Sequence, residues 1–302
     1  MFVTIKAYYC SNHVTIESIM SQLVQMRQRI KAIETIKKIT SAMRLISRSM
    51  HTRMNKEKVH LIEHQKEVLE SFMRLCTEYP QWDSPLFFPL KTADPHELYI
   101  IIGAQKGLCG MYNTNLLNWI KKNAELLQQP SSNILTIGKK ICDQLTKYKI
   151  KEMRQLQELK LSSISSISNE LVDHIVNAEK KYTRVVLISN YAHTFFVHRH
   201  KETKLIPLAL TKPLDKEEIS TYLWQNNPQE ILDSIARMYL QSTIRTLLFE
   251  ALAGEQAARF IAMDNATRNA DKFLDEMQLQ YNKMRQAKIT KELTELAGNF
   301  TL

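Results

Sequence analysis

The chain has 302 residues with only 6 glycines and 8 prolines, and an all-β fold would need more turn-forming residues than that. Hydrophobic residues make up 44% of the sequence and charged residues 24%, a balance that excludes extensive disorder. Lys and Arg outnumber Asp and Glu to give a net charge of +10, and no apolar run approaches the roughly 18 residues of a membrane-spanning helix. The composition therefore predicts a folded, basic protein that does not insert into a membrane.

Residues 1–20 match neither a secretory signal nor an Arg-rich transit peptide, because they carry one Lys, one Glu and no Arg. We interpret them as an extension of unknown role, with Met20 as an alternative start. The four cysteines are scattered and form no C-x-x-C pair, which argues against a zinc site or a disulfide framework. This pattern is typical of a reducing compartment.

Residues 21–79 are predicted to form one long helix, because no proline occurs before Pro80. Apolar and small residues recur there at alternating spacings of three and four, the pattern of a coiled-coil seam. The predicted seam consists of Ile33, Ile36, Thr40, Met43, Ser47, Met50 and Met54. One face of an ordinary core helix is the alternative interpretation.

Residues 95–215 are predicted to form a central α/β domain. Short apolar β-rich runs at 97–103, 134–138 and 185–189 alternate with amphipathic stretches at 113–127, 141–148 and 164–181. Strands that alternate with helices favour a mainly parallel sheet, to which residues 195–200 and 204–208 could add an edge.

Residues 228–300 are predicted to form a second long helix, opened by Pro228 and capped by Asn227. Its seam consists of Ala270, Leu274, Met277, Tyr281 and Met284. Each terminal helix needs a partner for its apolar stripe, so the two are expected to pair antiparallel. The predicted fold class is α/β plus long helices, an antiparallel coiled coil of the terminal helices with a central Rossmann-like α/β domain.

Three short motifs have features of ligand sites. The loop 103–110 follows a strand and precedes a helix, but Met111 and Tyr112 stand where a P-loop needs Lys and Ser or Thr, so we expect a tight turn instead of a phosphate site. Residues 60–64 match the zinc signature H-x-x-E-H, but they lie on a charged helix and are expected to form a solvated face. His193, His198 and His200 are interpreted as surface histidines.

Residues 27–66 contain eleven Lys or Arg against three Glu, so this segment alone carries a charge of +8. Three interpretations stay open: a solvated face, contact with nucleic-acid phosphates, or contact with an acidic protein. No aromatic residue lies between Tyr9 and Phe72, which argues against stacking on single-stranded bases. Binding to a duplex backbone through charge alone is the alternative function, that of a basic coiled-coil nucleic-acid-binding protein.

Several segments resemble the gamma subunit of F-type ATP synthases. The resemblance lies in order along residues 29–43 (RIKAIETIKKITSAM), 107–110 with Asn113 and Asn115, 255–259, 262–267 and 281–295 (YNKMRQAKITKELTE). It implies a rotor subunit that couples ion flow through a membrane ring to ATP synthesis on partner subunits. It also implies that the chain itself is no enzyme and needs no cofactor.

The implied partners are the alpha and beta subunits of the catalytic ring, the epsilon subunit and the membrane c-ring, with no nucleic acid and no direct membrane insertion. The implied location is peripheral, on the cytoplasmic face of the bacterial inner membrane. Positions that match family contacts with the catalytic subunits are Lys37, Lys38, Met43, Glu255, Arg259, Arg285, Gln286, Thr290 and Glu292.

Overall fold

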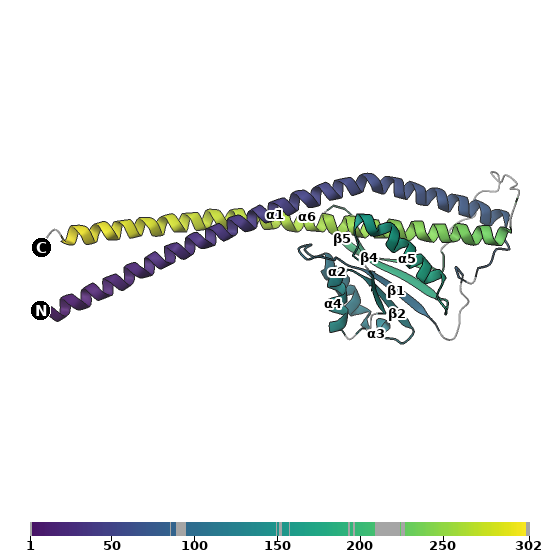
Figure 1. The fold of residues 1–302 in the computed structure, drawn as a ribbon, viewed down its shortest axis with the longest axis horizontal. Coiled ribbons are helices and arrows are strands. Elements are labelled where there is room, and N and C mark those ends of the chain that lie inside the picture. Colours follow the sequence, from purple (N-terminus) through teal and green to yellow (C-terminus); the bar gives the residue numbers. More distant parts are fainter. Residues whose placement is uncertain are drawn as a thin grey trace. The chain divides into compact units, whose positions relative to one another are not determined.

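The computed structural model describes residues 2–84, 86–88, 95–148, 150, 153–156, 158–192, 194–195, 197–208, 224 and 227–299; side chains are described from Ser21 onward, without those of His198, Glu295, Gly298 and Asn299. The chain divides into two units, residues 1–45 with 263–302 (unit 1) and residues 46–262 (unit 2). Two helices run through both units: α1, Phe2–Glu78, and α6, Pro228–Asn299 (Figure 1).

Unit 2 is built on a five-stranded sheet in the order β3-β2-β1-β4-β5. Its strands are β1 Glu97–Ile102, β2 Ser132–Ile137, β3 Arg154–Leu156, β4 Arg184–Ala192 and β5 His198–Ile206. The first four run parallel, and β5 pairs antiparallel with β4 at the edge. The central strand β1 is buried along almost its whole length, as expected when helices cover both faces of a parallel sheet.

Helices cover both faces of this sheet. They are α2 Tyr112–Lys122, α3 Ala124–Leu127, α4 Lys139–Lys147 and α5 Ile164–Val176, with a single 3₁₀ turn at Leu161–Ser163 before α5. Alternation along β1 separates the two cores: Tyr99 and Ile101 pack with α2 and α4, whereas Ile100 and Ile102 face α5 and α6. The sheet is therefore buried on both sides.

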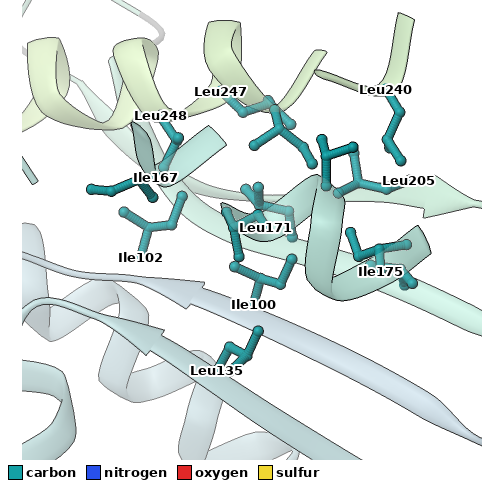
Figure 2. Packing of buried hydrophobic residues seen from close by; sticks show 14 of the residues in the cluster. Ile100, Ile102, Leu135, Ile167, Leu171, Ile175, Leu205, Leu240, Leu247 and Leu248 are labelled. Atoms are coloured by element: carbon teal, nitrogen blue, oxygen red, sulfur yellow. The ribbon is translucent and has the colours of Figure 1, made fainter. Parts of the chain in front are cut away.

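The α6 face of the sheet carries the larger core. Figure 2 shows Ile167, Leu171 and Ile175 of α5 between strand residues such as Ile100 and the leucines of α6. This packing continues into α1, whose Met54 and Phe72 are fully buried in the same cluster. The α/β domain is thus fixed to both long helices within unit 2.

The long helices run antiparallel in unit 2. Lys58 pairs with Glu250 at 3.1 Å, and the Gln65 amide donates to the Thr243 hydroxyl at 3.0 Å. Two residues seven positions apart on α1 therefore contact two residues seven positions apart on α6, in the reverse chain order. The Asn227 side chain accepts a hydrogen bond from the backbone N–H of Gln229, which confirms the predicted cap at the start of α6.

The two helices are also antiparallel in unit 1, with the same spacing of seven residues between contacts. Lys37 pairs with Asp271 at 2.5 Å, and Arg44 pairs with Asp264 at 2.9 Å. Between them the Thr267 hydroxyl donates to the Thr40 hydroxyl at 3.0 Å in a buried contact. A two-helix coiled coil with a heptad spacing is thus present in unit 1.

The predicted fold class is confirmed, with local differences. In the predicted seam of α1, Thr40, Ser47 and Met54 are buried, but Ile36 is 52% exposed, so its inward placement was wrong. Lys37 reaches Asp271 instead.

The predicted boundaries also differ in places. Helix α1 begins at Phe2 instead of Ser21, α5 ends at Val176, and β3 was not predicted. The edge of the sheet is a single strand, β5, where two segments were expected. The predicted domain limit at residue 215 lies outside the described residues.

A disulfide should form readily across the seam of unit 1. Replacing both Thr40 and Thr267 by Cys places two thiols where two hydroxyl oxygens lie 3.0 Å apart, within the reach of a disulfide. The expected result is near-complete cross-linking under mild oxidation, read by mass spectrometry after proteolysis. The exposed Ile39 provides the control, since Ile39→Cys with Thr267→Cys should stay reduced. Equal cross-linking of both pairs would contradict the seam.

Candidate partner-binding surface

The contact between α1 and α6 in unit 1 combines apolar side chains with polar pairs, and Ala270 and Leu274 of α6 are buried there. Asp271 raises the pKa of Lys37 through a hydrogen bond and its charge, and the hydrogen bond from Arg44 lowers the pKa of Asp264. The Lys37 and Asp271 side chains are still 43% and 46% exposed. Because water screens pairs of this exposure, the charges set the register of the helices more than their stability.

Large apolar side chains in unit 1 point outward instead. Each is about half exposed or more, and they occur on both helices: Val24, Ile36, Ile39 and Leu45 on α1, and Phe273, Leu279, Ile289, Leu293 and Leu296 on α6. Exposed apolar residues scattered singly are common on protein surfaces, but nine on the two helices of one unit form an extensive apolar surface.

Energetics favour enclosure of this surface. Full burial of one exposed Ile, Leu or Phe side chain contributes about 1.5–3 kcal/mol, which exceeds the contribution of an exposed ion pair in the seam. A partner that buries these side chains would therefore add stabilisation that the two helices alone do not have. The outer surface of unit 1 has the chemistry of an interface with a surrounding partner.

Basic side chains lie beside these apolar residues. Within the part of the chain that the structure describes, Arg27, Arg29, Lys31 and Lys38 are all exposed and form no ion pair. Lys37, by contrast, is engaged by Asp271. The cations available to an external partner are thus those on the outer face, Lys38 among them.

The predicted contact residues near the end of α6 lie on the surface. Arg285, Gln286 and Thr290 are exposed, and Glu292 is exposed while pairing with Lys288 at 3.4 Å. Met43, on α1, is half-buried. The structure leaves these side chains accessible to a second molecule.

Glu255 and Arg259 are placed differently, inside unit 2. Glu255 is 6% exposed and Arg259 8% exposed, and the Arg259 guanidinium donates a hydrogen bond to the Glu255 carboxylate one helical turn away. Burial raises the pKa of Glu255, and the attraction of Arg259 opposes that rise. Both side chains face inward within this chain.

The glycine loop at 103–110 is a tightly packed strand-to-helix turn. A Cβ atom on Gly103 would lie 1.9 Å from Cγ1 of Ile141, so only glycine fits between β1 and α4. The Ala104 N–H donates to Asn113 Oδ1 at 3.0 Å, and the Gln105 side chain accepts from the Lys139 N–H at the start of α4. These hydrogen bonds of the loop's polar groups stabilise the conformation of the loop.

Helix α6 packs against the carboxyl ends of the central strands, where open α/β sheets usually bind their ligands. A Cβ atom on Gly254 would lie 3.4 Å from the Asn190 carbonyl oxygen and 3.6 Å from the Tyr112 ring. The Tyr112 hydroxyl donates to the Ala251 carbonyl oxygen at 2.9 Å. The carboxyl ends of the strands are therefore occupied by α6.

The histidines of the zinc-like motif stand on the exposed side of α1. His60 and His64 are both exposed, and His60 lies 3.7 Å from Glu63. No group of three or more potential metal ligands occurs among the residues described. Of the second histidine set, His193 and the side chain of His198 lie outside the described residues.

Across the described parts of the chain, no helix combines the length and the apolar character needed to span a bilayer.

Comparison with known proteins agrees with this geometry. A family model described as ATP synthase matches residues 22–301. The ATP synthase gamma chain of Clostridium novyi is 30% identical over 287 residues, covering 91% of this chain and 96% of that protein. The chain belongs to the ATP synthase gamma chain family. The gamma chain of Symbiobacterium thermophilum is 28% identical and covers 90% of this chain and 95% of its own length.

Solved structures share the fold. A chain from the central stalk and c-ring structure of the Tetrahymena thermophila mitochondrial ATP synthase aligns with a TM-score of 0.54 at 21% identity, covering 76% of this chain and 99% of that one. A chain of the Euglena gracilis mitochondrial enzyme aligns with the same TM-score at 18% identity, covering 86% and 94%. Both therefore support the arrangement of long helices around an α/β domain.

Sequence reasoning missed the acidic side of the seam. Asp264 and Asp271 are seven residues apart on α6, as Arg44 and Lys37 are on α1, and this matched spacing was a usable signal. The outward apolar residues of α6, such as Phe273, were also missed. Phe273 directly precedes the predicted seam residue Leu274, and its exposure can be recognised only once the buried face of the helix is known.

Two glycines of the loop should respond differently to substitution. Gly103→Ala forces a methyl group against Ile141 and should lower the free energy of unfolding by about 1–3 kcal/mol. Gly107→Ala is the matched control, because a Cβ atom there meets nothing within 4 Å. Thermal unfolding of the full chain measures both. Equal melting temperatures for the two variants would show that the loop is not packed as described.

Proposed function

We propose that this chain is the central rotor shaft of an F-type ATP synthase, coupling ion flow through a membrane ring to ATP synthesis on partner subunits. The observation that carries the proposal is the exposed apolar surface of unit 1, where nine large apolar side chains stay exposed on two helices whose register ion pairs and a hydroxyl pair fix. Membership of the ATP synthase gamma chain family indicates which complex the chain belongs to, and this surface supports the role of a shaft enclosed by other subunits.

A shaft of this kind transmits torque through its asymmetry. Two helices present different side chains at every angle around their common axis, so each surrounding catalytic subunit meets a different surface at a given moment. Rotation then changes the conformation, and with it the nucleotide affinity, of each catalytic subunit in turn. The chain itself carries no chemistry in this account, because catalysis belongs to the beta subunits.

The outer basic residues suit an acidic partner. Lys38 is exposed and lies on α1 five residues before the half-buried Met43, and we assign this stretch of α1 to contact with the catalytic ring. Exposed charge pairs contribute only about 0–1 kcal/mol each, which fits a contact that is made and broken at each step of rotation. Lys37 and the buried Glu255 and Arg259 are better suited to holding the chain's own helices and loop.

Near the end of α6, Arg285, Gln286, Thr290 and Glu292 form the second proposed contact with the ring. Their polar groups are exposed on one long helix beside the apolar Ile289 and Leu293. An apolar contact flanked by polar ones is the usual anatomy of a protein interface. Alpha and beta subunits are the partners proposed here.

The α/β domain is proposed to join the epsilon subunit and the membrane c-ring. The location follows as peripheral, on the cytoplasmic face of a bacterial inner membrane. The solved relatives include assemblies described as central stalk and c-ring, which supports this placement by analogy of fold. Nucleic acid is the rival partner, and tight salt-dependent DNA binding by the purified chain would favour it.

Loss of the proposed contact at the end of α6 should impair coupling without preventing assembly. Replacing Arg285, Gln286 and Thr290 together by Ala removes polar contacts, of which each bond to a charged group is worth about 1.5–3 kcal/mol. The seam and the α/β domain still hold the subunit, so subunit stoichiometry should stay unchanged. ATP turnover linked to ion pumping in the reconstituted complex is expected to fall markedly.

Three exposed residues of α1 in unit 2 provide the control for this experiment. His60, Glu63 and His64 belong to none of the proposed contacts, and their joint replacement by Ala should leave turnover and pumping near the wild-type values. Unaltered pumping in the α6 triple variant would refute the assignment of its three residues. A complex that forms without this chain, or excludes it, would refute the rotor proposal itself.

A further inference from the structure

A cavity of about 1030 Å³ lies within unit 2, lined by residues of α1, α6 and the segment that leads into α5. Its apolar wall includes Met50 and Leu61 of α1, Ile164 of α5 and Phe249 of α6. Ile164 and Phe249 are buried members of the larger core, so this wall belongs to the packed interior of unit 2. The volume is at the upper end of that of small-molecule sites, roughly 300–1,000 Å³.

Three cations from different segments also line this cavity. Arg53 comes from α1, Lys160 from the segment before α5, and Arg245 from α6. Glu57 is the one carboxylate among the described lining residues, so the lining carries a net charge of +2 with histidine counted as neutral. The exposed histidines of the zinc-like motif border the cavity but are not among the contacts proposed below. The cavity therefore combines an apolar wall with an excess of positive charge.

The three cations are accessible to a ligand. Arg245 is exposed and forms no ion pair in the described part of the chain. Arg53 Nε lies 3.1 Å from Glu57, and Lys160 Nζ lies 2.7 Å from Glu158. The Arg53 and Lys160 side chains are 67% and 60% exposed, and pairs of this exposure are weak because water screens them. An anion with several oxygens can therefore share or replace the two carboxylates at little cost.

Hydrogen bonds fix the segment that carries Lys160. Its backbone N–H donates to the Ser163 hydroxyl at 2.9 Å, and that hydroxyl donates to the Glu158 carbonyl oxygen at 2.8 Å. Ser162 and Ser165 line the cavity beside this segment, and their hydroxyl groups can donate to an anion. A site whose walls are fixed before binding loses less conformational entropy when a ligand enters.

We infer that this cavity binds a phosphate ester with an apolar or aromatic body. The phosphate oxygens are bound by Arg53, Lys160 and Arg245. The body of the ligand packs against Met50 and Leu61. Phosphate suits this lining because a planar guanidinium group can donate to two of its oxygens at once. A nucleotide and an anionic lipid are two sources of this chemistry.

Calorimetric titration of the purified full chain tests the cavity. The probes are ADP and dihexanoyl phosphatidic acid below its micelle concentration, with inorganic phosphate as the reference. At least one organic probe is expected to bind with a Kd below about 1 mM. Inorganic phosphate should bind about tenfold more weakly or worse, because it lacks the apolar body.

The two probes distinguish the sources of the ligand. Binding of ADP alone identifies a nucleotide, binding of phosphatidic acid alone identifies a lipid headgroup, and binding of both shows that the cavity recognises their shared chemistry. Failure of both probes to bind, or equally tight binding of inorganic phosphate, would overturn the inference.

Replacement of one cation locates the charge contact. Arg245→Ala should weaken binding of the tighter probe by about tenfold or more, because hydrogen bonds to a charged group are lost. Arg237→Ala is the matched control, since it removes the same charge from the same helix at a residue that pairs with Asp173 outside the cavity. Its affinity should stay near the wild-type value. An equal loss in both variants would show that only net charge matters and would overturn the site.

A measurement on the wild-type chain guards against misfolding of the variants. The ¹³C-methyl NMR signal of Met50, which lines the cavity, should shift when the tighter probe saturates the chain. The signal of Met263, buried in unit 1, should not. A bound probe that leaves Met50 unshifted would overturn the site. The rotor proposal would still stand, because neither proposal depends on the other.

Discussion

Ion pairs and a hydroxyl pair fix the register of the two helices in unit 1, and nine large apolar side chains remain exposed on them. Lys37 with Asp271 and Arg44 with Asp264 define one register, because a shift of either helix would separate both pairs. They contribute little stability, since exposed pairs are weak. Burying exposed side chains such as Ile39 and Phe273 adds stabilisation, which requires a partner. A fixed register with an exposed apolar surface suits a shaft that works inside other subunits.

Unit 2 contains the large apolar core, although side chains such as Leu108 and Met111 are exposed. The sheet is covered on both faces, and α5 and the leucines of α6 pack in one core (Figure 2), which also contains Met54 and Phe72 of α1. Glycine at positions 103 and 254 allows strand, loop and helix to approach closely. The loop and α6 consequently behave as one packed body, and the charged pair Glu255–Arg259 lies within it. The same helix thus belongs to the core of the α/β domain in unit 2 and pairs with α1 alone in unit 1.

Periodicity and breaker residues were enough to predict the long helices, the alternating strands and most of the seam. They failed at Ile36, because spacing alone cannot report that Lys37 finds a carboxylate across the helix pair. They missed β3, which has only three residues and a mostly exposed pattern. Resemblance identified the family but not the burial of Glu255, since charged residues are ordinarily exposed. Which exposed residues touch the catalytic ring stays a prediction.

Rotation of this chain inside its complex is the most direct test of the rotor account. A bead attached through Lys140→Cys on α4, in a chain whose native cysteines are replaced, reports the angle of the α/β domain against an immobilised catalytic ring. Stepwise rotation in one direction, driven by ATP and stopped when ATP is removed, is the result that a shaft predicts. A stationary bead on complexes that still hydrolyse ATP through an intact ring and retain this chain would contradict it.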